Sequence, residues 1–149
     1  PMTWGFPRFK GSGVIINARS ETAAEKPMFA GSVRQQRCVI PGTGFYEWKK
    51  TKGREKEKVL FRLADEPVLH MAGLYQEDGE NSRFVILTTQ ANESVAPVHD
   101  RMPLILNKAE IRGWMEDASW ARALLDHHPD RPVLRGMPVA SDKRPDRRV

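Results

Sequence analysis

The sequence has one cysteine and no long hydrophobic run, and each absence excludes a class of protein. With a single cysteine among 149 residues, no intramolecular disulfide framework can form. No Cys/His spacing resembles a structural zinc site, and we expect neither a metal nor a cofactor. No apolar run approaches the roughly 20 residues that cross a bilayer. The first ten residues contain Trp4, Arg8 and Lys10 where a signal peptide would be apolar. We therefore expect a soluble cytoplasmic domain without membrane contact.

The length is that of one domain, residues 1–149, with a core of its own. Pro1 precedes Met2, which is unlike a native translation start. We therefore expect an N-terminal segment of the natural protein to be missing.

Charge is modest in sum but concentrated in two runs. The net charge is +5, and residues 49–58 and 131–149 each carry six positive and two negative side chains. Such clusters can follow a phosphate backbone. A solvated loop and a frayed tail explain charge runs alone better. Basicity permits a nucleic-acid partner here without demonstrating one.

The pattern of short β-branched and aromatic segments between turn residues predicts an α+β fold. We expect an antiparallel, barrel-like sheet with peripheral helices. Ser20 or Thr22 can cap a first helix, Asn107 and Glu110 form a box-like start to a second, and Ser119 opens a third. The expected strands are residues 14–16, 37–40, 44–49, 58–64, 68–75, 83–90, 103–106 and 133–140, and the expected helices are residues 20–36, 108–117 and 119–127. We expect the helix over residues 20–36 to be interrupted, because Pro27 and Gly31 divide it.

Residues 17–22 (NARSET) place polar side chains directly after an apolar strand. Asn17 and Arg19 can hold a ligand there, the arginine through charge-assisted bonds to phosphate. Helix capping by Ser20, with Glu21 in the first turn, is the structural alternative and can operate as well.

Glu47 lies among aromatic residues in the segment 44–48 (GFYEW). On a strand, Phe45 and Glu47 share one face while Tyr46 and Trp48 share the other. A poorly solvated carboxylate favours its protonated form and can act as a general acid near neutral pH. An ion pair with a nearby arginine explains the position equally well.

His99 is followed at once by Asp100 and Arg101. Asp100 or a backbone carbonyl can fix the tautomer of His99 and leave one ring nitrogen free for proton transfer. His127 and His128 fit the C-terminus of a helix better than a metal site. Trp4 can stack on a nucleobase if it is exposed, although core packing is the more frequent fate of a tryptophan.

Taken together and in order, these segments resemble the SRAP family, the SOS-response-associated peptidase domain. Residues 137–141 (MPVAS) are a weaker match to its closing strand. The matching segments are residues 4–6 (WGF), 17–22 (NARSET), 37–41 (RCVIP), 44–48 (GFYEW), 72–75 (AGLY), 87–92 (LTTQAN) and 99–103 (HDRMP).

The resemblance implies an abasic-site sensor in single-stranded DNA. In that family an N-terminal Cys forms a Schiff base through its α-amine, and its thiol then closes a thiazolidine crosslink. The family also processes its own N-terminus as a peptidase. By resemblance, Glu47 protonates the sugar ring oxygen and assists formation or reversal of the imine, and His99 moves a proton at the imine or stabilises the opened sugar. Asn17 orients the Cys main chain or the linkage, and Arg19 and Arg101 bind flanking phosphates. Trp4 and Thr88 resemble positions along the DNA path. We expect a monomer, associated with the nucleoid if the source is bacterial.

The sequence also departs from the family pattern. It lacks the family's N-terminal Met-Cys-Gly-Arg segment, and its only cysteine, Cys38, occupies a structural strand position. Two alternatives follow. A degenerate member would be a non-covalent single-stranded DNA binder. A thiol peptidase would use Cys38 with His99, and substitution of Cys38 should then abolish activity. We expect this substitution to have no effect.

Overall fold

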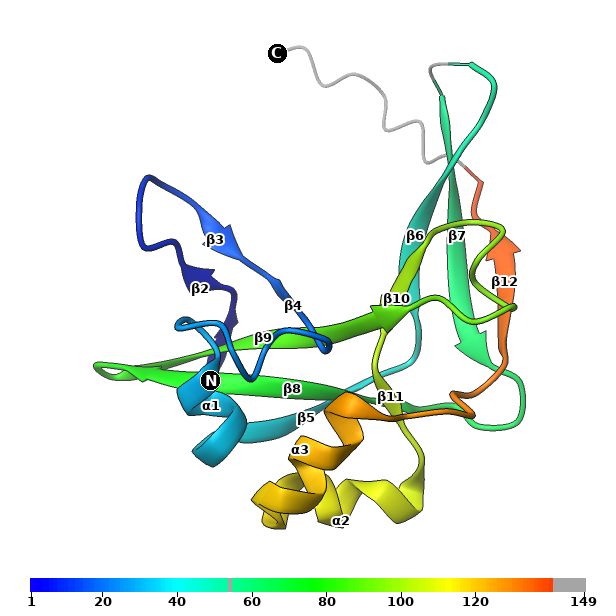
Figure 1. Cartoon of the computed structure of the whole chain (residues 1–149). Coiled ribbons are helices and arrows are strands. Elements are labelled where there is room, and N and C mark those ends of the chain that lie inside the picture. Colours follow the sequence, from blue (N-terminus) through cyan, green and yellow to red (C-terminus); the bar gives the residue numbers. More distant parts are fainter. Residues whose placement is uncertain (54, 141–149) are drawn as a thin grey trace.

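The computed structural model describes residues 1–53 and 55–140 and shows an α+β fold made mainly of strands (Figure 1). Seven strands form the largest sheet, in which β9 and β8 are the long central pair. These strands are β1 (Met2–Trp4), β4 (Asn17–Arg19), β5 (Arg37–Gly42), β8 (Leu69–Asp78), β9 (Asn81–Gln90), β10 (Arg101–Pro103) and β11 (Ile105–Leu106).

The largest sheet is mixed, which corrects the expectation of an antiparallel one. Strands β1 and β4 both run parallel to β9, whereas β5, β8, β10 and β11 pair antiparallel with their neighbours. Thr88 of β9 pairs with Arg19 of β4 and with Pro103 of β10. Because a strand residue has one partner on each edge, β9 lies between β4 and β10 at this point.

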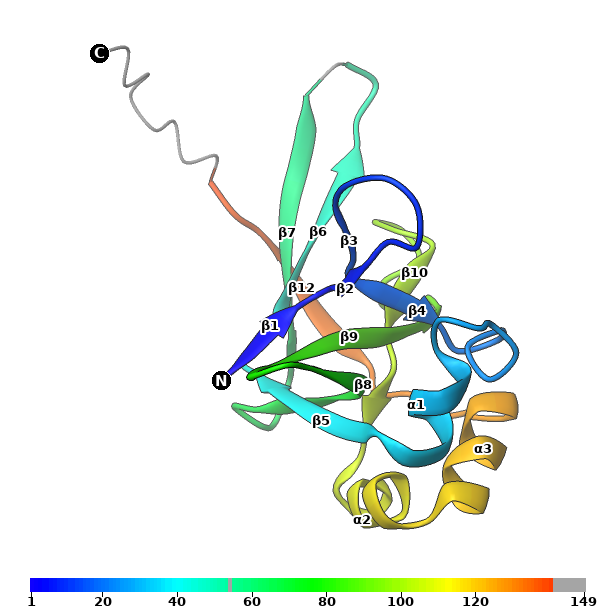
Figure 2. The same cartoon turned by 90° about the vertical axis from the view of Figure 1, so that its left-hand side faces the viewer.

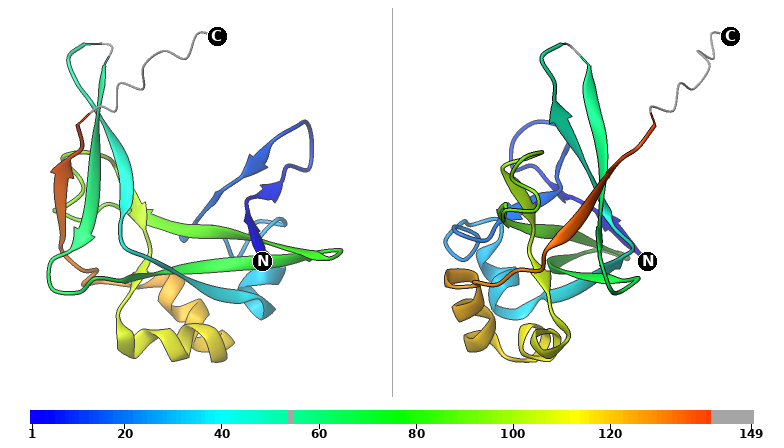
Figure 3. Two further views of the ribbon diagram at one scale, coloured as in Figure 1. Left: turned by 180° about the vertical axis from the view of Figure 1, so that it is seen from behind. Right: turned by 90° about the vertical axis from the view of Figure 1, so that its right-hand side faces the viewer.

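Two smaller sheets rise near opposite ends of the largest one, both on the side away from the helices (Figure 3). One consists of β6 (Phe45–Lys50), β7 (Lys56–Leu63) and β12 (Leu134–Pro138), and the β6–β7 hairpin extends well away from the helices (Figure 2). The other is the pair β2 (Phe6–Pro7) and β3 (Val14–Ile15). The described strands therefore form three open sheets, and the expected barrel does not close among them.

The three helices are α1 (Ala30–Gln35), α2 (Lys108–Glu116) and α3 (Ala118–Asp126), all on one side of the largest sheet (Figure 1). The expected capping box of α2 is present, with Asn107 and Glu110 bonded reciprocally. The expected helix over residues 20–36 is wrong in its first half. Residues 20–29 form turns, the N-cap of α1 is Phe29, and Ser20 caps nothing. Asp117, and not Ser119, caps α3.

Two apolar clusters hold these layers together. The helix side is packed around the fully buried Trp114, whose Nε1 donates to the carbonyl of Cys38 on β5. The second cluster lies between the β6–β7–β12 sheet and the ends of β8 and β9, around Phe61 and Ile105. On the side away from the helices, β9 contributes to the wall of a cavity.

Candidate functional site

A cavity of about 850 Å³ is lined mainly by residues of β1, β4, β5, β6, β8, β9 and β10, and all seven site residues predicted from the sequence line it. Its inner wall is apolar, formed by Ile40, Met71, Phe84, Ile86 and Met102. Sequence reasoning missed this wall because its members read as ordinary strand residues. The seven predicted site residues that line the cavity are Trp4, Asn17, Arg19, Glu47, Thr88, His99 and Arg101.

Glu47 and His99 face each other across the cavity from different elements. His99 Nε2 lies 3.8 Å from Glu47 Oε2, and the two side chains are 39% and 25% exposed. Burial raises the pKa of Glu47; the charge of His99 and a bond from the Trp48 backbone oppose this without reversing it. The predicted poor solvation of Glu47 is thus present in the structure. The predicted alternation along β6 is present as well: Phe45 and Glu47 are partly buried, whereas Tyr46 and Trp48 are exposed.

The other ring nitrogen of His99 is held by the backbone of Arg101. Nδ1 lies 3.1 Å from the Arg101 N–H and 3.2 Å from the Arg101 carbonyl oxygen, with Asp100 Oδ1 at 3.5 Å. When Nδ1 is unprotonated it accepts from the N–H, and when protonated it donates to the carbonyl. The ring can therefore gain or lose a proton without losing its Nδ1 partner.

The edge of the cavity nearest the chain's beginning is formed by β1 and β4. Asn17 and Arg19 are exposed at alternate positions of β4, so their side chains lie on one face, while Ala18 between them is buried. Trp4 is half exposed and stacks against Phe84 with ring centroids 6.1 Å apart. Its Nε1 donates to the Ile16 carbonyl. Trp4 is therefore a fixed aromatic surface at the rim and not a core residue.

Arg101 is held by neighbouring side chains within the fold. Its Nη1 and Nη2 donate to the two carboxylate oxygens of Glu21 at 2.8 and 2.9 Å. Nη2 also donates to the carbonyl and hydroxyl oxygens of Thr88. Sequence reasoning gave Glu21 only a helix-turn role. Nothing in the local pattern places it beside a residue that lies 80 positions further along the chain.

The β6–β7 hairpin separates its charges by face. The register pairs Trp48 with Lys58 and Lys50 with Lys56, and no carboxylate lies among them. On the other face, Lys49 is opposite Glu57. Lys58 Nζ lies 4.2 Å from the ring centroid of Tyr46 and 5.5 Å from that of Trp48. We call the side with Tyr46, Trp48, Lys50, Lys56 and Lys58 the basic face; it adjoins the cavity through Tyr46.

Cys38 does not line this cavity. It lies on β5, paired with Gly73 of β8, and burial raises the pKa of its thiol to about 11. A thiol that remains protonated at neutral pH is a poor nucleophile. The geometry thus offers no support for a peptidase built on Cys38 and His99.

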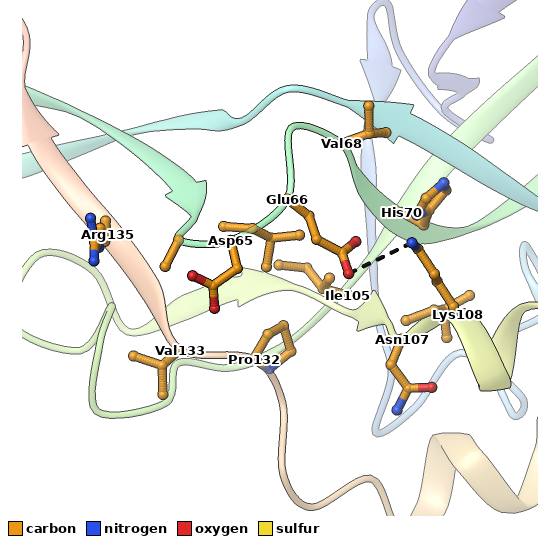
Figure 4. Close-up of a pocket in the computed structure, with 13 residues that line it drawn as sticks. Asp65, Glu66, Val68, His70, Ile105, Asn107, Lys108, Pro132, Val133 and Arg135 are labelled. Carbon is orange, nitrogen blue, oxygen red and sulfur yellow. Dashed lines mark ion pairs between the residues drawn. The ribbon is translucent and has the colours of Figure 1, made fainter.

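A second pocket of about 560 Å³ lies between the β7–β8 turn, the start of α2 and β12 (Figure 4). An ion pair joins Lys108 Nζ to Glu66 Oε1 at 3.7 Å on its wall (Figure 4). None of the seven predicted residues lines this pocket.

Of the two histidines after α3, His128 contacts the helix through its side chain. His128 Nδ1 donates to the Leu124 carbonyl, and its Nε2 is 2.6 Å from Thr89 Oγ1. Residues 1–53 and 55–140 contain no group of three or more His, Cys, Asp or Glu side chains placed to hold a metal ion. Within the same residues, no helix is long and apolar enough to span a membrane.

Residues 1–142 match the family model described as SOS response associated peptidase (SRAP). The chain belongs to the SRAP family. It is 36% identical over 106 residues to the abasic site processing protein YoaM of Bacillus subtilis, covering 68% of this chain and 47% of that protein. It is 32% identical over 120 residues to the abasic site processing protein YedK of Escherichia coli, covering 77% and 54%. The chain thus spans about half the length of these relatives.

Solved structures show that the SRAP fold is shared. A crystal structure of a protein from Bacteroides thetaiotaomicron superposes with a TM-score of 0.74 at 30% identity, covering 85% of this chain and 59% of that one. A phage-related protein from Bordetella bronchiseptica superposes with a TM-score of 0.75 at 26% identity, covering 93% and 70%.

Proposed function

We propose that this SRAP chain is part of an abasic-site sensor that crosslinks itself to single-stranded DNA. The observation that carries the proposal is the convergence of seven residues, distant in sequence, on one cavity in which Glu47 faces His99. The names of the relatives, which process abasic sites, support the same substrate. The nucleophile we propose is an N-terminal Cys of the longer protein, outside these 149 residues.

The proposed chemistry begins with the ring-opened sugar of the abasic site. The Cys α-amine attacks the aldehyde carbon, water leaves, and an imine forms. The thiol sulfur then adds to the imine carbon while the imine nitrogen takes a proton, which closes the thiazolidine. Glu47, whose raised pKa keeps more of it protonated, supplies the proton for sugar-ring opening. His99 carries a proton at the imine.

The remaining cavity residues bind and orient the DNA in this proposal. Asn17 orients the Cys main chain or the linkage, and Arg19 grips a flanking phosphate. Arg101 contacts a second phosphate through the Nη1 hydrogen that Glu21 leaves free, because that nitrogen carries two hydrogens. Trp4 and Thr88 line the path of the strand.

Single-stranded DNA fits the surface beside the cavity. On the basic face of the hairpin, cations that can neutralise phosphates lie next to two exposed rings on which bases can stack. An acidic peptide would use the lysines but leave the rings without a role. We propose that the protein acts as a monomer, and that self-processing at the N-terminal Cys precedes crosslinking.

The test uses the longer protein with its N-terminal Cys exposed, incubated with an oligonucleotide that contains one abasic site. We expect an adduct that survives a denaturing gel and disappears when the N-terminal Cys is replaced by Ser. Absence of the adduct from the unaltered protein would refute the proposal. Salt-dependent binding that persists without any adduct would instead identify a non-covalent DNA binder.

A further inference from the structure

We propose that Glu21 is a positioning residue, which through Arg101 fixes the two sides of the cavity relative to each other. The expected effect on crosslinking rests on the proposed function. The expected effect on the position of the His99 ring can be measured in the protein without DNA. The inference concerns how Asn17 on β4 and His99, in the segment just before β10, are kept in place relative to each other.

The ion pair between Glu21 and Arg101 spans a strand. Arg101 belongs to β10, Glu21 follows β4, and Thr88 of β9 lies between these two strands. The Arg101 guanidinium reaches over Thr88, bonding its carbonyl and hydroxyl, and ends on both oxygens of Glu21. In the sheet, backbone hydrogen bonds join β9 to β4 and β9 to β10, but not β4 to β10. The Arg101 side chain connects all three segments.

Each end of this connection lies close to a residue that the proposed reaction uses. On one side, Asn17 lies four positions before Glu21, on β4. On the other side, both backbone partners of His99 Nδ1 belong to Arg101 itself. A shift of the Arg101 backbone therefore moves the imidazole relative to Glu47. Misplacing a reacting group by about 1 Å can cost roughly 100-fold in rate.

The pair differs from the exposed ion pairs of the helices. The Arg101 side chain is 18% exposed, whereas Arg112, paired with Glu116 on α2, is 87% exposed. Exposed pairs on a helix contribute little, because water competes for both charges. The hydrogen bond from Arg101 lowers the pKa of Glu21 despite partial burial, so the carboxylate remains charged and bound to the guanidinium.

The first experiment compares Glu21→Gln with Glu25→Gln, an exposed glutamate of the same turn region that does not line the cavity. We expect Glu21→Gln to lower the crosslinking rate at saturating DNA about tenfold or more, with the DNA dissociation constant nearly unchanged. Glu25→Gln should leave both unchanged. Tighter DNA binding by Glu21→Gln, with no loss of rate, would overturn the proposal by showing that Glu21 merely competes with phosphate for Arg101.

The second experiment needs no DNA and no reaction. In 15N spectra of the free protein, we expect the ring-nitrogen shifts of His99 to change in Glu21→Gln and in Arg101→Lys, but not in Glu25→Gln. The double variant Glu21→Gln/Arg101→Lys should crosslink no more slowly than the slower single variant, because both changes break one connection. Unchanged His99 shifts would overturn the proposal even if the protein crosslinks DNA. If no protein crosslinks, the proposed function fails and the shifts still decide the role of Glu21.

Discussion

Two arginine–glutamate pairs with the same chemistry lie in different parts of this molecule. Arg131 binds both oxygens of Glu110 within the helix layer, where the two side chains are 8% and 14% exposed. Arg101 binds both oxygens of Glu21 at the cavity, where the exposures are 18% and 46%. The first pair is closed off by core residues, so its loss should affect stability. The second opens to the cavity, so its loss should affect geometry.

The partly buried carboxylates Glu47 and Glu110 show the same contrast. Burial pushes the pKa of Glu110 upward, but bonds from Arg131 and the Asn107 backbone outweigh it and leave the pKa lowered. Glu47 lacks an arginine partner among the described residues, and burial leaves its pKa raised. The hydrogen-bond partners, more than the burial, decide which glutamate remains charged and which can donate a proton.

The largest effect should come from Glu47→Gln, which removes the acid and keeps the shape. We expect a roughly 1,000-fold loss of crosslinking rate, as for a lost general acid. In the unaltered protein the rate should fall as pH rises through the pKa of Glu47, because the acid form is lost. The raised pKa places this fall above the range of an ordinary glutamate. The measurement is single-turnover crosslinking across pH; a variant with the parent's rate and pH profile would remove Glu47 from the chemistry.

Breaking the helix-layer pair with Arg131→Gln should affect stability and not reaction geometry. Removing one partner of a buried pair leaves an uncompensated charge, so we expect the free energy of unfolding to fall by about 3 kcal/mol. The check is urea denaturation, with Arg112→Gln on the exposed pair of α2 as the matched control. Equal losses in the two variants would contradict the contrast drawn between closed and open surroundings.

Acid should weaken the same pair. Glu110 has a folded-state pKa below its unfolded value, so its stabilisation is present above the unfolded value and is lost as pH falls through the lowered one. We therefore expect the unfolding free energy of Arg131→Gln to depend less steeply on pH in this acidic window than that of the parent. If the unfolding free energies of the two proteins changed with pH in parallel, the pair would not be the source of this pH dependence.

A smaller effect should separate the two faces of the β6–β7 hairpin. Lys50→Gln/Lys56→Gln removes two cations of the basic face, whereas Lys49→Gln removes one that lies opposite Glu57. For single-stranded DNA, we expect the double variant to reduce the slope of log affinity against log salt by about 0.7 for each phosphate that it no longer neutralises. Fluorescence anisotropy at several salt concentrations measures this, and a similar change per lysine in Lys49→Gln would show that the face does not matter.

The smallest effect should come from Cys38→Ala. The thiol is half-buried, its surroundings raise its pKa to about 11, and it lies outside the cavity, so we expect the crosslinking rate to be unchanged. Loss of crosslinking without loss of folding, judged by circular dichroism, would revive the alternative in which Cys38 reacts.

Several local elements were predictable because their signals are short-range. The capping box of Asn107 and Glu110, the alternation that faces Glu47 inward, and most strand positions depend on neighbours a few residues apart. The expected helix over residues 20–36 was wrong in its first half, which forms turns, and no local signal pairs Glu21 of this half with the distant Arg101. Parallel pairing of β1 and β4 with β9 has no local signature either.

By itself, the sequence determined the fold class, the family and the identity of seven candidate site residues, because motif order and residue type are properties of the chain. Only the tertiary structure decided that these seven line one cavity, that Glu47 has no arginine partner among residues 1–53 and 55–140, and that Glu21 holds Arg101 across β9. Those outcomes depend on contacts between residues far apart in sequence, and burial and pairing exist only once the chain has folded.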